Sequence, residues 1–532
     1  MQIDLEQHAA RTEPFHAKVC IVGAGIAGLI LAQRFAALGI DVALLEAGGH
    51  TLEDRSQIIY NARMAARTHT GTHEGRFRTL GGSSTRWGGQ ILPYTADIFQ
   101  PPSLLSHSWP ITAEEIAPFY PAAQSILGAD ALPFEAPGFF DELHLPTPSL
   151  QSALPEIDVR FSKWAPFSRR NLANTVARDL LAPNAGRVTV YLHANVTELL
   201  LTPDGSRIEA ALVRNYAGTR FRFQADHFVL AAGTIESSRL LLASRSVATS
   251  GVGNQYDQVG RYFHDHLSVP AATLTGATRR QLLQGFAPFL LHGTTHTAKF
   301  EASPALRKRL DLLAVMAHIV IIEPEDSGAG VARALLQSLQ RRDFGSALRK
   351  QLPRLPTASL DLLRLALAAK LKHRRFVSSR ASVMLCIDSE QLPRPENRVR
   401  IDDELDALGL PRTVVDWNIA PIEVATLRTF ASWLREGLAE LQLGPIDWRS
   451  EFFDDISDLS GITDTYHPMG GLRMGNDPRA SVVDTDLQVH GIGNLFIASA
   501  AVFPAGGSSN PTFTLMALTL RLAEHINAQL SR

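Results

Sequence analysis

Val19-Cys20-Ile21-Val22-Gly23-Ala24-Gly25-Ile26-Ala27-Gly28 is the stretch from which the rest of the sequence is best interpreted. A short apolar run rich in β-branched residues leads directly into three glycines with the spacing GxGxxG. The apolar pattern from Leu29 to Leu38 then predicts a helix, which Gly39 ends. Asp41 to Leu45 predicts a second strand, and Glu46 follows at its end. Together these features predict a complete βαβ unit.

Each part of this unit has a role in binding a dinucleotide. We expect Gly23 to permit the tight turn, Gly25 to let a pyrophosphate approach the backbone, and Gly28 to allow close helix packing. The helix N-terminus would face the phosphates, because its N–H groups are free and its end is partly positive. Glu46 would accept hydrogen bonds from the adenosine ribose. The motif leaves FAD and NAD open, but Glu46 argues against NADP, since a carboxylate repels a 2′-phosphate.

A second glycine cluster, Leu80-Gly81-Gly82-Ser83-Ser84-Thr85-Arg86-Trp87-Gly88-Gly89, predicts a loop against a flat polar ligand. By itself the segment is also compatible with an ordinary surface loop. Together with the first motif it resembles the glucose-methanol-choline (GMC) family of FAD-dependent alcohol oxidoreductases, especially bacterial sugar-type members and the pyranose oxidase branch. The resemblance covers residues 17–50, 80–94, 226–242, 259–267, 388–417 and 464–525, and is weakest over about 275–380.

The resemblance implies a mixed α/β fold. A Rossmann-like FAD-binding domain would carry a second, substrate-binding domain built on an antiparallel sheet. It further implies that the cofactor is FAD and places residues from both glycine motifs and from later segments beside it. These residues are Gly23, Gly25, Gly28, Glu46, Gly81, Gly82, Ser83, Ser84, Arg86, Trp87, Gly88, Val196, Ala232, Gly233, Ser499, Pro511 and Thr512.

The proposed chemistry lies in the C-terminal third. A lone histidine such as His467 is more often structural than catalytic. The family's active-site histidine, however, lies in a segment like Thr465-Tyr466-His467-Pro468-Met469-Gly470-Gly471, and its second active-site position matches Asn510. The resemblance therefore implies that His467 takes the alcohol proton as hydride leaves for flavin N5, while Asn510 orients the developing alkoxide.

Asn510 has a second predicted role. Asn510-Pro511-Thr512 reads as a helix start, with Asn as the N-cap and Pro at the first helical position. The positive end of that helix would stabilise charge on the reduced flavin. An Asn engaged in capping cannot freely bind a substrate oxygen, so we expect Ser509 to share the capping.

Two positions depart from the family pattern. Arg86 stands where the pyranose oxidase branch has a histidine bonded to the flavin, which predicts non-covalent FAD; His73 is the alternative attachment point. Ser499 stands where many members have an aspartate, so its contact with the cofactor should be weaker. The cluster His264-Asp265-His266 has the residue types of a metal site, but no third ligand set accompanies it, so we expect no metal.

The composition indicates an ordinary globular protein. Apolar residues make up 45% and charged residues 20% of the 532, which disfavours disordered and collagenous classes. With 51 Lys and Arg against 53 Asp and Glu, the net charge is -2. A chain of this charge has no general affinity for nucleic acid, so we expect no nucleic-acid partner.

Cysteine usage and the N-terminus both favour the cytoplasm. Cys20 and Cys386 are the only cysteines, which excludes a disulfide scaffold and fits a reducing compartment. The segment beginning at Met1 has no basic region followed by an apolar core, so we expect no secretion signal. The uncharged stretch from Leu487 to Leu520 is interrupted by glycine and proline and predicts a buried strand, loop and helix.

The sequence predicts three regions. The FAD-binding domain would comprise residues 1–100, 185–270 and 455–532, and the substrate domain residues 101–184 and 271–454. Strand-like runs at Leu313–Ile322 and Ser382–Ile387 lack βαβ spacing, which favours an antiparallel substrate sheet.

Residues 331–380, named here the helical insertion, form the third region. It carries twelve Lys or Arg against Asp343 and Asp361, a net charge of +10. Leucines at helical spacing, split by Pro353 and Pro356, predict two basic amphipathic helices. One interpretation is a solvated insertion or lid. The other is a surface that rests on an anionic membrane at the inner face, within reach of a lipid-linked substrate or a quinone.

The sequence thus predicts an FAD-dependent enzyme that oxidises a CH–OH group of a sugar or another polyhydroxylated alcohol. Oxygen, a quinone and a cytochrome all stay open as the electron acceptor. A flavoprotein lyase of the same fold, an NAD-dependent dehydrogenase and a non-catalytic cofactor-binding protein are the alternatives.

Overall fold

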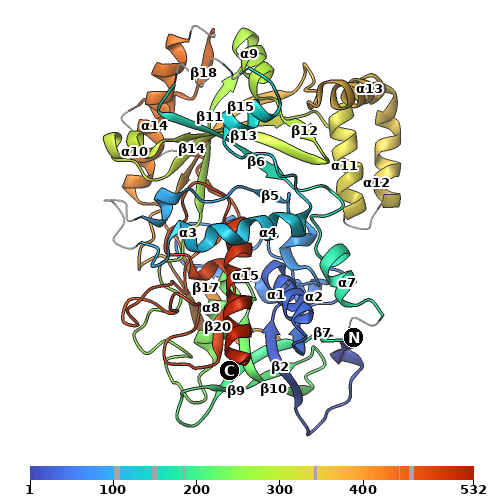
Figure 1. The fold of residues 1–532 in the computed structure, drawn as a ribbon, viewed down its shortest axis with the longest axis vertical. Helices are drawn as coiled ribbons and strands as arrows, with labels where there is room; N and C mark the ends of the chain where they lie inside the picture. Colours follow the sequence, from blue (N-terminus) through green and yellow to red (C-terminus); the bar gives the residue numbers. More distant parts are fainter. Residues whose placement is uncertain are drawn as a thin grey trace.

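A computed structural model describes residues 1–100, 108–146, 148, 154–183, 186–340, 344–441, 444–454 and 460–531 (Figure 1). Two large sheets lie at opposite ends of the long axis, and helices pack around each. A smaller three-stranded sheet joins β4 (Ala62–Met64), β16 (Arg398–Leu405) and β17 (Pro411–Asp416).

The first sheet contains the predicted βαβ unit. Its strand order is β1-β7-β3-β2-β10-β9-β8, and β20 pairs with the later part of β10. The strand pairs from β1 to β10 are parallel, and the pairs β10–β9 and β9–β8 are antiparallel. Its strands are β1 (Gln2–Asp4), β2 (Phe15–Val22), β3 (Val42–Leu45), β7 (Val188–Leu192), β8 (Asn195–Leu201), β9 (Ile208–Arg214), β10 (Arg220–Leu230) and β20 (Leu495–Ile497). All four residues of β3 are buried, as expected for a strand with both faces covered.

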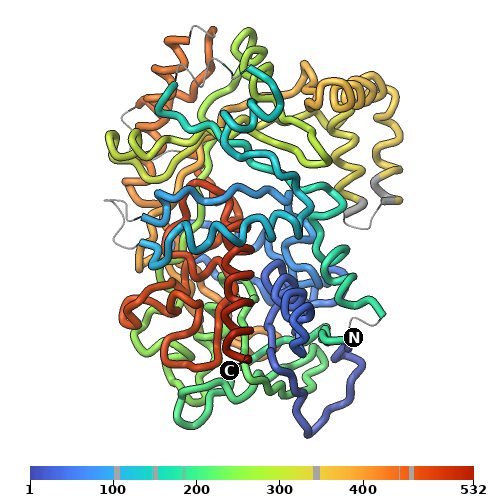
Figure 2. The backbone as a smooth tube through the Cα atoms, in the orientation of Figure 1, coloured from blue at the N-terminus to red at the C-terminus, as the bar shows by residue number. Residues whose placement is uncertain are grey.

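Helices cover this sheet and bring the chain ends together. α1 (Ile26–Ala37) follows β2, α8 (Thr234–Ala243) follows β10, and α15 (Pro511–Leu530) ends the chain. α15 lies beside α1 although almost the whole sequence separates them (Figure 2). The predicted strand, loop and helix over 487–520 are confirmed as β20 and the start of α15.

The second sheet is antiparallel, as predicted. Its order is β18-β11-β15-β14-β13-β6-β5, with β12 on β13 and β19 on β11. The two predicted runs form β14 and β15. The strands are β5 (Gln90–Ile91), β6 (Ile157–Trp164), β11 (His266–Leu274), β12 (Phe289–Leu291), β13 (Thr294–Ala302), β14 (Val315–Ile322), β15 (Ser382–Glu390), β18 (Ile446–Trp448) and β19 (Thr463–Asp464).

Most of the remaining α-helices outside the helical insertion are short; the two longer ones are α9 (Gly276–Phe286) and α14 (Pro421–Glu440). α14 packs an apolar face on the second sheet, with Leu427 and Phe430 fully buried. The short helices are α2 (Asp54–Gln57), α3 (Ala113–Ile116), α4 (Tyr120–Leu127), α5 (Ala136–Glu142), α7 (Arg178–Leu180) and α10 (Pro304–Leu310).

Part of segment 101–184 packs with the first sheet and not with the second. α3 and α4 pack on α15, because Ile116, Ala123 and Leu127 belong to the core of the first sheet. The Tyr120 hydroxyl also lies 2.9 Å from the Thr514 hydroxyl on α15. In the other direction, β5 and β19 belong to the second sheet although 1–100 and 455–532 were assigned to the FAD-binding domain. The boundaries at 101, 184 and 455 lie outside the described residues.

The helical insertion forms three helices where the sequence predicted two. They are α11 (Gly328–Gln340), α12 (Phe344–Gln351) and α13 (Leu355–Lys372), and they project from one side of the second sheet (Figure 1). The predicted proline break is the one between α12 and α13, where Pro353 lies in a short 3₁₀ turn and Pro356 in the first turn of α13. Arg341, Arg342 and Asp343 lie outside the described residues.

Within the described ranges, no helix is both long enough and apolar enough to cross a membrane.

Candidate active site

A cavity of about 710 Å³ runs from the glycine turn after β2 to the start of α15. Most predicted cofactor residues line it: Gly23, Gly25, Glu46, Gly82, Ser83, Arg86, Trp87, Gly88, Val196, Ala232, Gly233, Ser499, Pro511 and Thr512. The two predicted catalytic residues, His467 and Asn510, line it as well. The fold therefore brings segments that lie far apart in the sequence to one space.

Three predicted cofactor residues do not line the cavity. Gly28 packs against the glycine turn, where an added Cβ would lie 1.9 Å from the Gly23 carbonyl oxygen. Gly81 adopts a left-handed conformation with φ +93°, and its Cβ position faces Ala173. The Ser84 hydroxyl donates to the Gly81 carbonyl oxygen at 2.6 Å. These three residues shape the loops and do not contact the ligand space.

The glycine turn leaves room for a ligand at one position. A Cβ on Gly25 would meet no protein atom within 4 Å, and Gly25 faces the cavity. Ile26 and Ala27, the first residues of α1, line the same wall, so the N-terminus of the helix faces into the space. This is the geometry that admits a pyrophosphate.

Glu46 lies buried at one end of the cavity. Its two carboxylate oxygens accept hydrogen bonds from the Ala24 and Gly48 backbone N–H groups, at 3.0 and 2.9 Å. Burial raises the pKa of Glu46, while these hydrogen bonds act in the opposite direction. Each oxygen keeps a second lone pair, so the carboxylate can also accept from a ribose.

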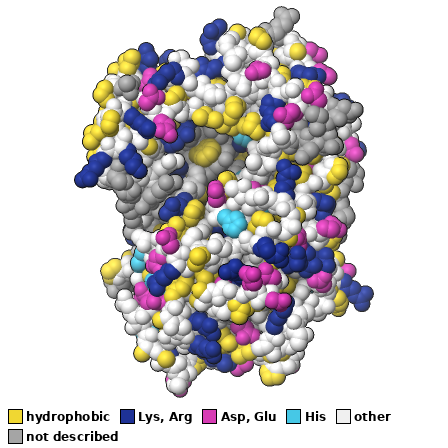
Figure 3. Space-filling model, turned by 180° about the vertical axis from the view of Figure 1, so that it is seen from behind, with side chains coloured by type: hydrophobic (Ala, Val, Ile, Leu, Met, Phe, Trp, Pro, Cys, Tyr) yellow, Lys and Arg dark blue, Asp and Glu magenta, His cyan; other side chains and the backbone are white. Residues whose placement is uncertain are grey.

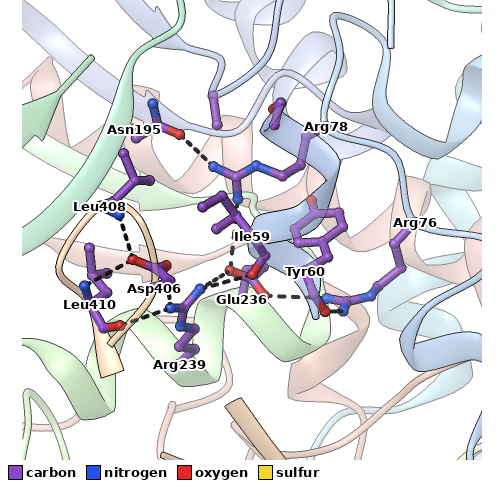
Figure 4. Close-up of polar contacts among 12 residues, drawn as sticks. Ile59, Tyr60, Arg76, Arg78, Asn195, Glu236, Arg239, Asp406, Leu408 and Leu410 are labelled. Atoms are coloured by element: carbon purple, nitrogen blue, oxygen red, sulfur yellow. Dashed lines mark hydrogen bonds and ion pairs between the residues drawn. The ribbon is translucent and has the colours of Figure 1, made fainter. Parts of the chain in front are cut away.

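An arginine cluster beside this end was not predicted. Arg76, Arg78 and Arg239 surround Glu236 (Figure 4), with nitrogen to oxygen distances of 3.4, 3.9 and 3.3 Å. All four residues line the cavity, as does Tyr60, over whose ring the Arg76 guanidinium lies at 4.2 Å. The signal in the sequence was the pair Arg76-Phe77-Arg78 directly before the second glycine cluster, but a basic pair is too common to assign by itself.

His467 and Asn510 lie together at the other end of the cavity. The Asn510 side-chain nitrogen is 2.9 Å from His467 Nε2. Burial, followed by the neighbouring His266, lowers the pKa of His467 to about 4. The imidazole is therefore neutral at pH 7, the form that can accept a proton.

The hydrogen bonds around His467 select one tautomer. His266 Nε2 lies 3.2 Å from the Gly506 carbonyl oxygen, which can only accept, so His266 Nδ1 carries a lone pair. His467 Nδ1 lies 3.1 Å from that atom and 2.8 Å from the Thr465 hydroxyl oxygen. His467 therefore carries its proton on Nδ1 and presents the Nε2 lone pair to Asn510 and the cavity.

Asp265 fixes the positions of Thr465 and His467 through hydrogen bonds. It is fully buried and accepts the Thr465 hydroxyl at 3.2 Å and the His467 backbone N–H at 2.8 Å. Burial alone would raise the pKa of Asp265, but the hydrogen bond from His69 and the nearby imidazoles lower it. The sequence suggested only a metal-ligand role for Asp265, and this contact was not predicted.

The predicted capping by Asn510 and Ser509 is wrong in part. Asn510 is the N-cap residue of α15 by position, but its side chain makes no capping hydrogen bond. The Ser509 hydroxyl donates to the Pro93 carbonyl oxygen at 3.4 Å. The Asn510 amide is committed to His467, so capping and catalysis do not compete for it.

Asp265 has the residue types of a metal site around it, but with partners other than its sequence neighbours His264 and His266. The fold brings His69 and Asp464, which are far away in sequence, to Asp265, with ligand atoms all within 4.8 Å. His69 Nε2 lies 3.2 Å from Asp265, and Asp464 accepts the Thr70 and Gly71 backbone N–H groups at 2.6 Å each. These atoms already have protein partners, and the absence of a metal stays a prediction.

The residues that bear on cofactor attachment also have clear positions. The Arg86 guanidinium lies 5.1 Å from the centre of the Phe77 ring and lines the cavity. Of the residues that the structure describes, those lining the cavity do not include His73, the alternative attachment point. The Ser499 hydroxyl accepts the Ala501 backbone N–H at 3.1 Å.

Comparison with known proteins identifies two segments of the chain that match one oxidoreductase family. Residues 165–268 match the N-terminal model, and residues 393–519 the C-terminal model, of a family described as GMC oxidoreductase. The chain is 26% identical to the 6'''-hydroxyparomomycin C oxidase of Streptomyces lividus, over 96% of this chain and 92% of that protein. It is 24% identical to the fructose dehydrogenase large subunit of Gluconobacter japonicus, over 97% and 98%.

A solved structure shares the fold. The crystal structure of pyridoxine 4-oxidase from Mesorbium loti superposes with a TM-score of 0.60 at 17% identity, covering 96% of this chain and 99% of that chain. The two family-model matches, the relatives that align over almost the whole chain and the shared fold lead to one conclusion. The chain belongs to the GMC oxidoreductase family and is an enzyme that oxidises alcohols.

Proposed function

We propose that the protein oxidises a CH–OH group of a sugar or another polyhydroxylated alcohol to a carbonyl, with FAD as cofactor. The observation that carries this proposal is a neutral His467, with its Nε2 lone pair 2.9 Å from the Asn510 amide, in the cavity that the dinucleotide motif also lines. Two full-length relatives named for oxidising sugar-type molecules support the substrate class.

The family implies FAD, and the cavity residues fit it. The open side of Gly25 and the N-terminus of α1 would hold the pyrophosphate, Glu46 the ribose, and the N-terminus of α15 the electron-rich edge of the flavin. When bound, FAD supplies the acceptor for the hydride that leaves the carbinol carbon. We propose that Arg86 leaves this FAD without a covalent bond, so acid precipitation should release all its colour into the supernatant.

The side chains of the catalytic end then have distinct tasks. His467 Nε2 takes the hydroxyl proton, and Thr465 and His266 hold the ring by its other nitrogen. The Asn510 amide, which lies beside His467 Nε2, then donates its hydrogen bond to the substrate oxygen, where negative charge develops. Asp265 stabilises the imidazolium that forms, because its carboxylate lies one hydroxyl away.

Anaerobic titration of the yellow holoprotein tests the proposal. Neutral sugars and simple alcohols are added while the flavin absorbance near 450 nm, a general property of flavins, is followed. Loss of this band together with one equivalent of carbonyl product is expected. A flavoprotein lyase would convert its substrate without bleaching, and an NAD-dependent enzyme would require added NAD.

We also propose that the enzyme works in the cytoplasm, with the helical insertion resting on the anionic inner face of the membrane. Leucines on α13 that share one helical face point to solvent, with exposed fractions of 55%, 57%, 48% and 71% for Leu360, Leu363, Leu367 and Leu371. Exposed basic residues accompany them, and hydrophobic and basic side chains mix on this corner of the surface (Figure 3). Such a surface complements anionic lipid and would bring the enzyme to a quinone-type acceptor.

Sedimentation with vesicles tests this contact. Wild-type protein should sediment with phosphatidylglycerol vesicles at low salt and less at high salt, because salt screens the attraction between the basic residues and the anionic lipid. The double substitution Leu363→Ser and Leu367→Ser should abolish binding. Leu38→Ser, which changes an exposed leucine at the end of α1, should not. Failure of the wild type to sediment at low salt, or self-association through this face, would contradict the proposal.

A further inference from the structure

The two faces of the second sheet differ in chemistry. On β14 and β15, Ala317, Leu385 and Ile387 point to one side and are buried in the core beneath α14. The other side carries the polar side chains of Lys299 on β13, His318 on β14 and Asp388 on β15, together with the buried Met316 and Cys386. Polar side chains on a sheet face need hydrogen-bond partners from water, from the protein or from a ligand.

This polar face reaches the active site at both ends. Cross-strand partners share a face, and the pairs Trp164↔Thr295 and Ser268↔Asp388 extend it across five strands. Trp164 lines the cavity. At the other end, His266 pairs with Glu390 and its ring contacts His467. The polar face is therefore continuous with the space over the catalytic pair.

Lys299 lies at the centre of this face. Its side chain is 5% exposed. Among the described residues, its ammonium has no hydrogen-bond or ion-pair partner. Burial lowers the pKa of Lys299, and the carboxylates of Asp388 and Glu301 act against this from a distance. An ammonium that is almost fully buried and has no protein partner can be stabilised by a ligand atom that accepts its hydrogen bonds.

One oxygen of a neighbouring carboxylate is left without a partner: Asp388 Oδ1 is buried and accepts no hydrogen bond from the described residues. Arg160 pairs with Glu301 at 3.1 Å, and His318 Nδ1 lies 3.1 Å from Asp388. Both Lys299 and Asp388 alter the pKa of His467, in opposite directions, so they lie within electrostatic reach of the base. The strand register places both residues on the sheet face that His266 continues to His467.

We propose that Lys299 and Asp388 form a substrate subsite that binds hydroxyl groups of a neutral polyhydroxylated ring, remote from the carbon that is oxidised. Lys299 donates to a ring hydroxyl oxygen, and Asp388 or its neighbour Ser268 accepts the hydroxyl hydrogen. This inference rests on the proposed function, because it takes the oxidised carbon to lie at His467.

The charge balance gives the preference for a neutral ring. At the subsite itself, Lys299 and Asp388 carry one charge of each sign, and the neighbouring Arg160–Glu301 pair adds none. Glu390, farther along the face, accepts the Gly506 and Gly507 backbone N–H groups. A carboxylate on the substrate would face Asp388, and an ammonium would face Lys299, so each ionic substrate meets one repulsion. A hydroxyl both donates and accepts, and it suits both residues.

The experiment compares wild-type holoenzyme with Lys299→Met, which keeps the length of the side chain and removes its charge. Lys308→Met, an exposed lysine on α10, is the matched control. The probes are D-glucose, D-galactose, D-fructose, D-glucuronate, D-glucosamine and 1-propanol. Half-saturation is measured by anaerobic flavin bleaching, and binding separately by quenching of tryptophan fluorescence, since Trp87 and Trp164 line the cavity.

The expected result has three parts. A neutral sugar half-saturates the wild type at a lower concentration than glucuronate or glucosamine. Lys299→Met raises that concentration about tenfold to a hundredfold, because a hydrogen bond to a charged group is lost, and leaves the maximal bleaching rate within about twofold. The constant for 1-propanol, which has no remote hydroxyl, does not change. Lys308→Met behaves as the wild type throughout.

Other outcomes separate the two proposals. If sugars bleach the wild type and Lys299→Met equally at the same concentration, the subsite is wrong and the alcohol oxidation stands. Tightest use of glucuronate or glucosamine would also overturn the subsite. If no alcohol bleaches the flavin, the proposed function fails, and fluorescence then decides the subsite. A Lys299→Met protein that melts well below the wild type would show a structural lysine, and Asp388→Asn must then reproduce the sugar-specific loss.

Discussion

His467→Ala should lower the rate of flavin reduction by about a hundredfold to ten-thousandfold, while the protein stays yellow. The imidazole is the proton acceptor beside Asn510, and alanine leaves none within hydrogen-bond reach of the substrate oxygen. FAD should stay bound, because the glycine turn, Glu46 and the start of α15 are unaffected. Stopped-flow reduction at saturating alcohol measures the loss, and the absorbance ratio measures FAD content.

The control and the pH profile sharpen this prediction. His50→Ala removes an exposed histidine and should reduce flavin at the wild-type rate. Because the pKa of His467 lies near 4, the base is neutral at all higher pH, and wild-type reduction should fall only as pH drops through about 4. An unaltered rate in His467→Ala would remove the histidine from the mechanism.

A matched pair of glycine substitutions should separate folding from cofactor binding. In Gly28→Ala the new Cβ would lie 1.9 Å from the Gly23 carbonyl oxygen, so the turn must move, and we expect a loss of about 1–3 kcal/mol or more in unfolding free energy together with loss of FAD. In Gly25→Ala the new Cβ meets no protein atom but enters the cavity, so the protein should fold normally and bind FAD poorly.

Thermal unfolding and the flavin to protein ratio measure both effects. The apoproteins should differ in melting temperature, with Gly25→Ala close to the wild type and Gly28→Ala well below it. If Gly25→Ala retained full FAD, the cavity wall beside it would not be the pyrophosphate site.

The local parts of the fold could be predicted because their signals are local. The βαβ unit follows from short-range periodicity and glycine spacing, and β14 and β15 follow from apolar runs. The count of helices in the insertion was wrong because Pro353 and Pro356 were the only helix-ending signals used, and no proline lies between α11 and α12.

The candidate site depends on contacts between distant segments. His467 and Asn510 were named from family resemblance, but the tautomer of His467 depends on His266, some 200 positions away, and on Asp265 behind Thr465. The arginines around Glu236 come from a loop and a helix with no shared motif. Periodicity describes neighbours along the chain, and these groups are neighbours only after folding.

The attachment of the helical insertion has a consequence for how such enzymes diversify. Ile322, the last residue of β14, pairs directly with Ser382, the first residue of β15, so the chain leaves the sheet and returns to it at the same point. A tight turn could join these two residues without shifting a single strand pair. The insertion is therefore a module that a chain could lose or exchange while the sheet beneath keeps its strand pairs and presents the same surface.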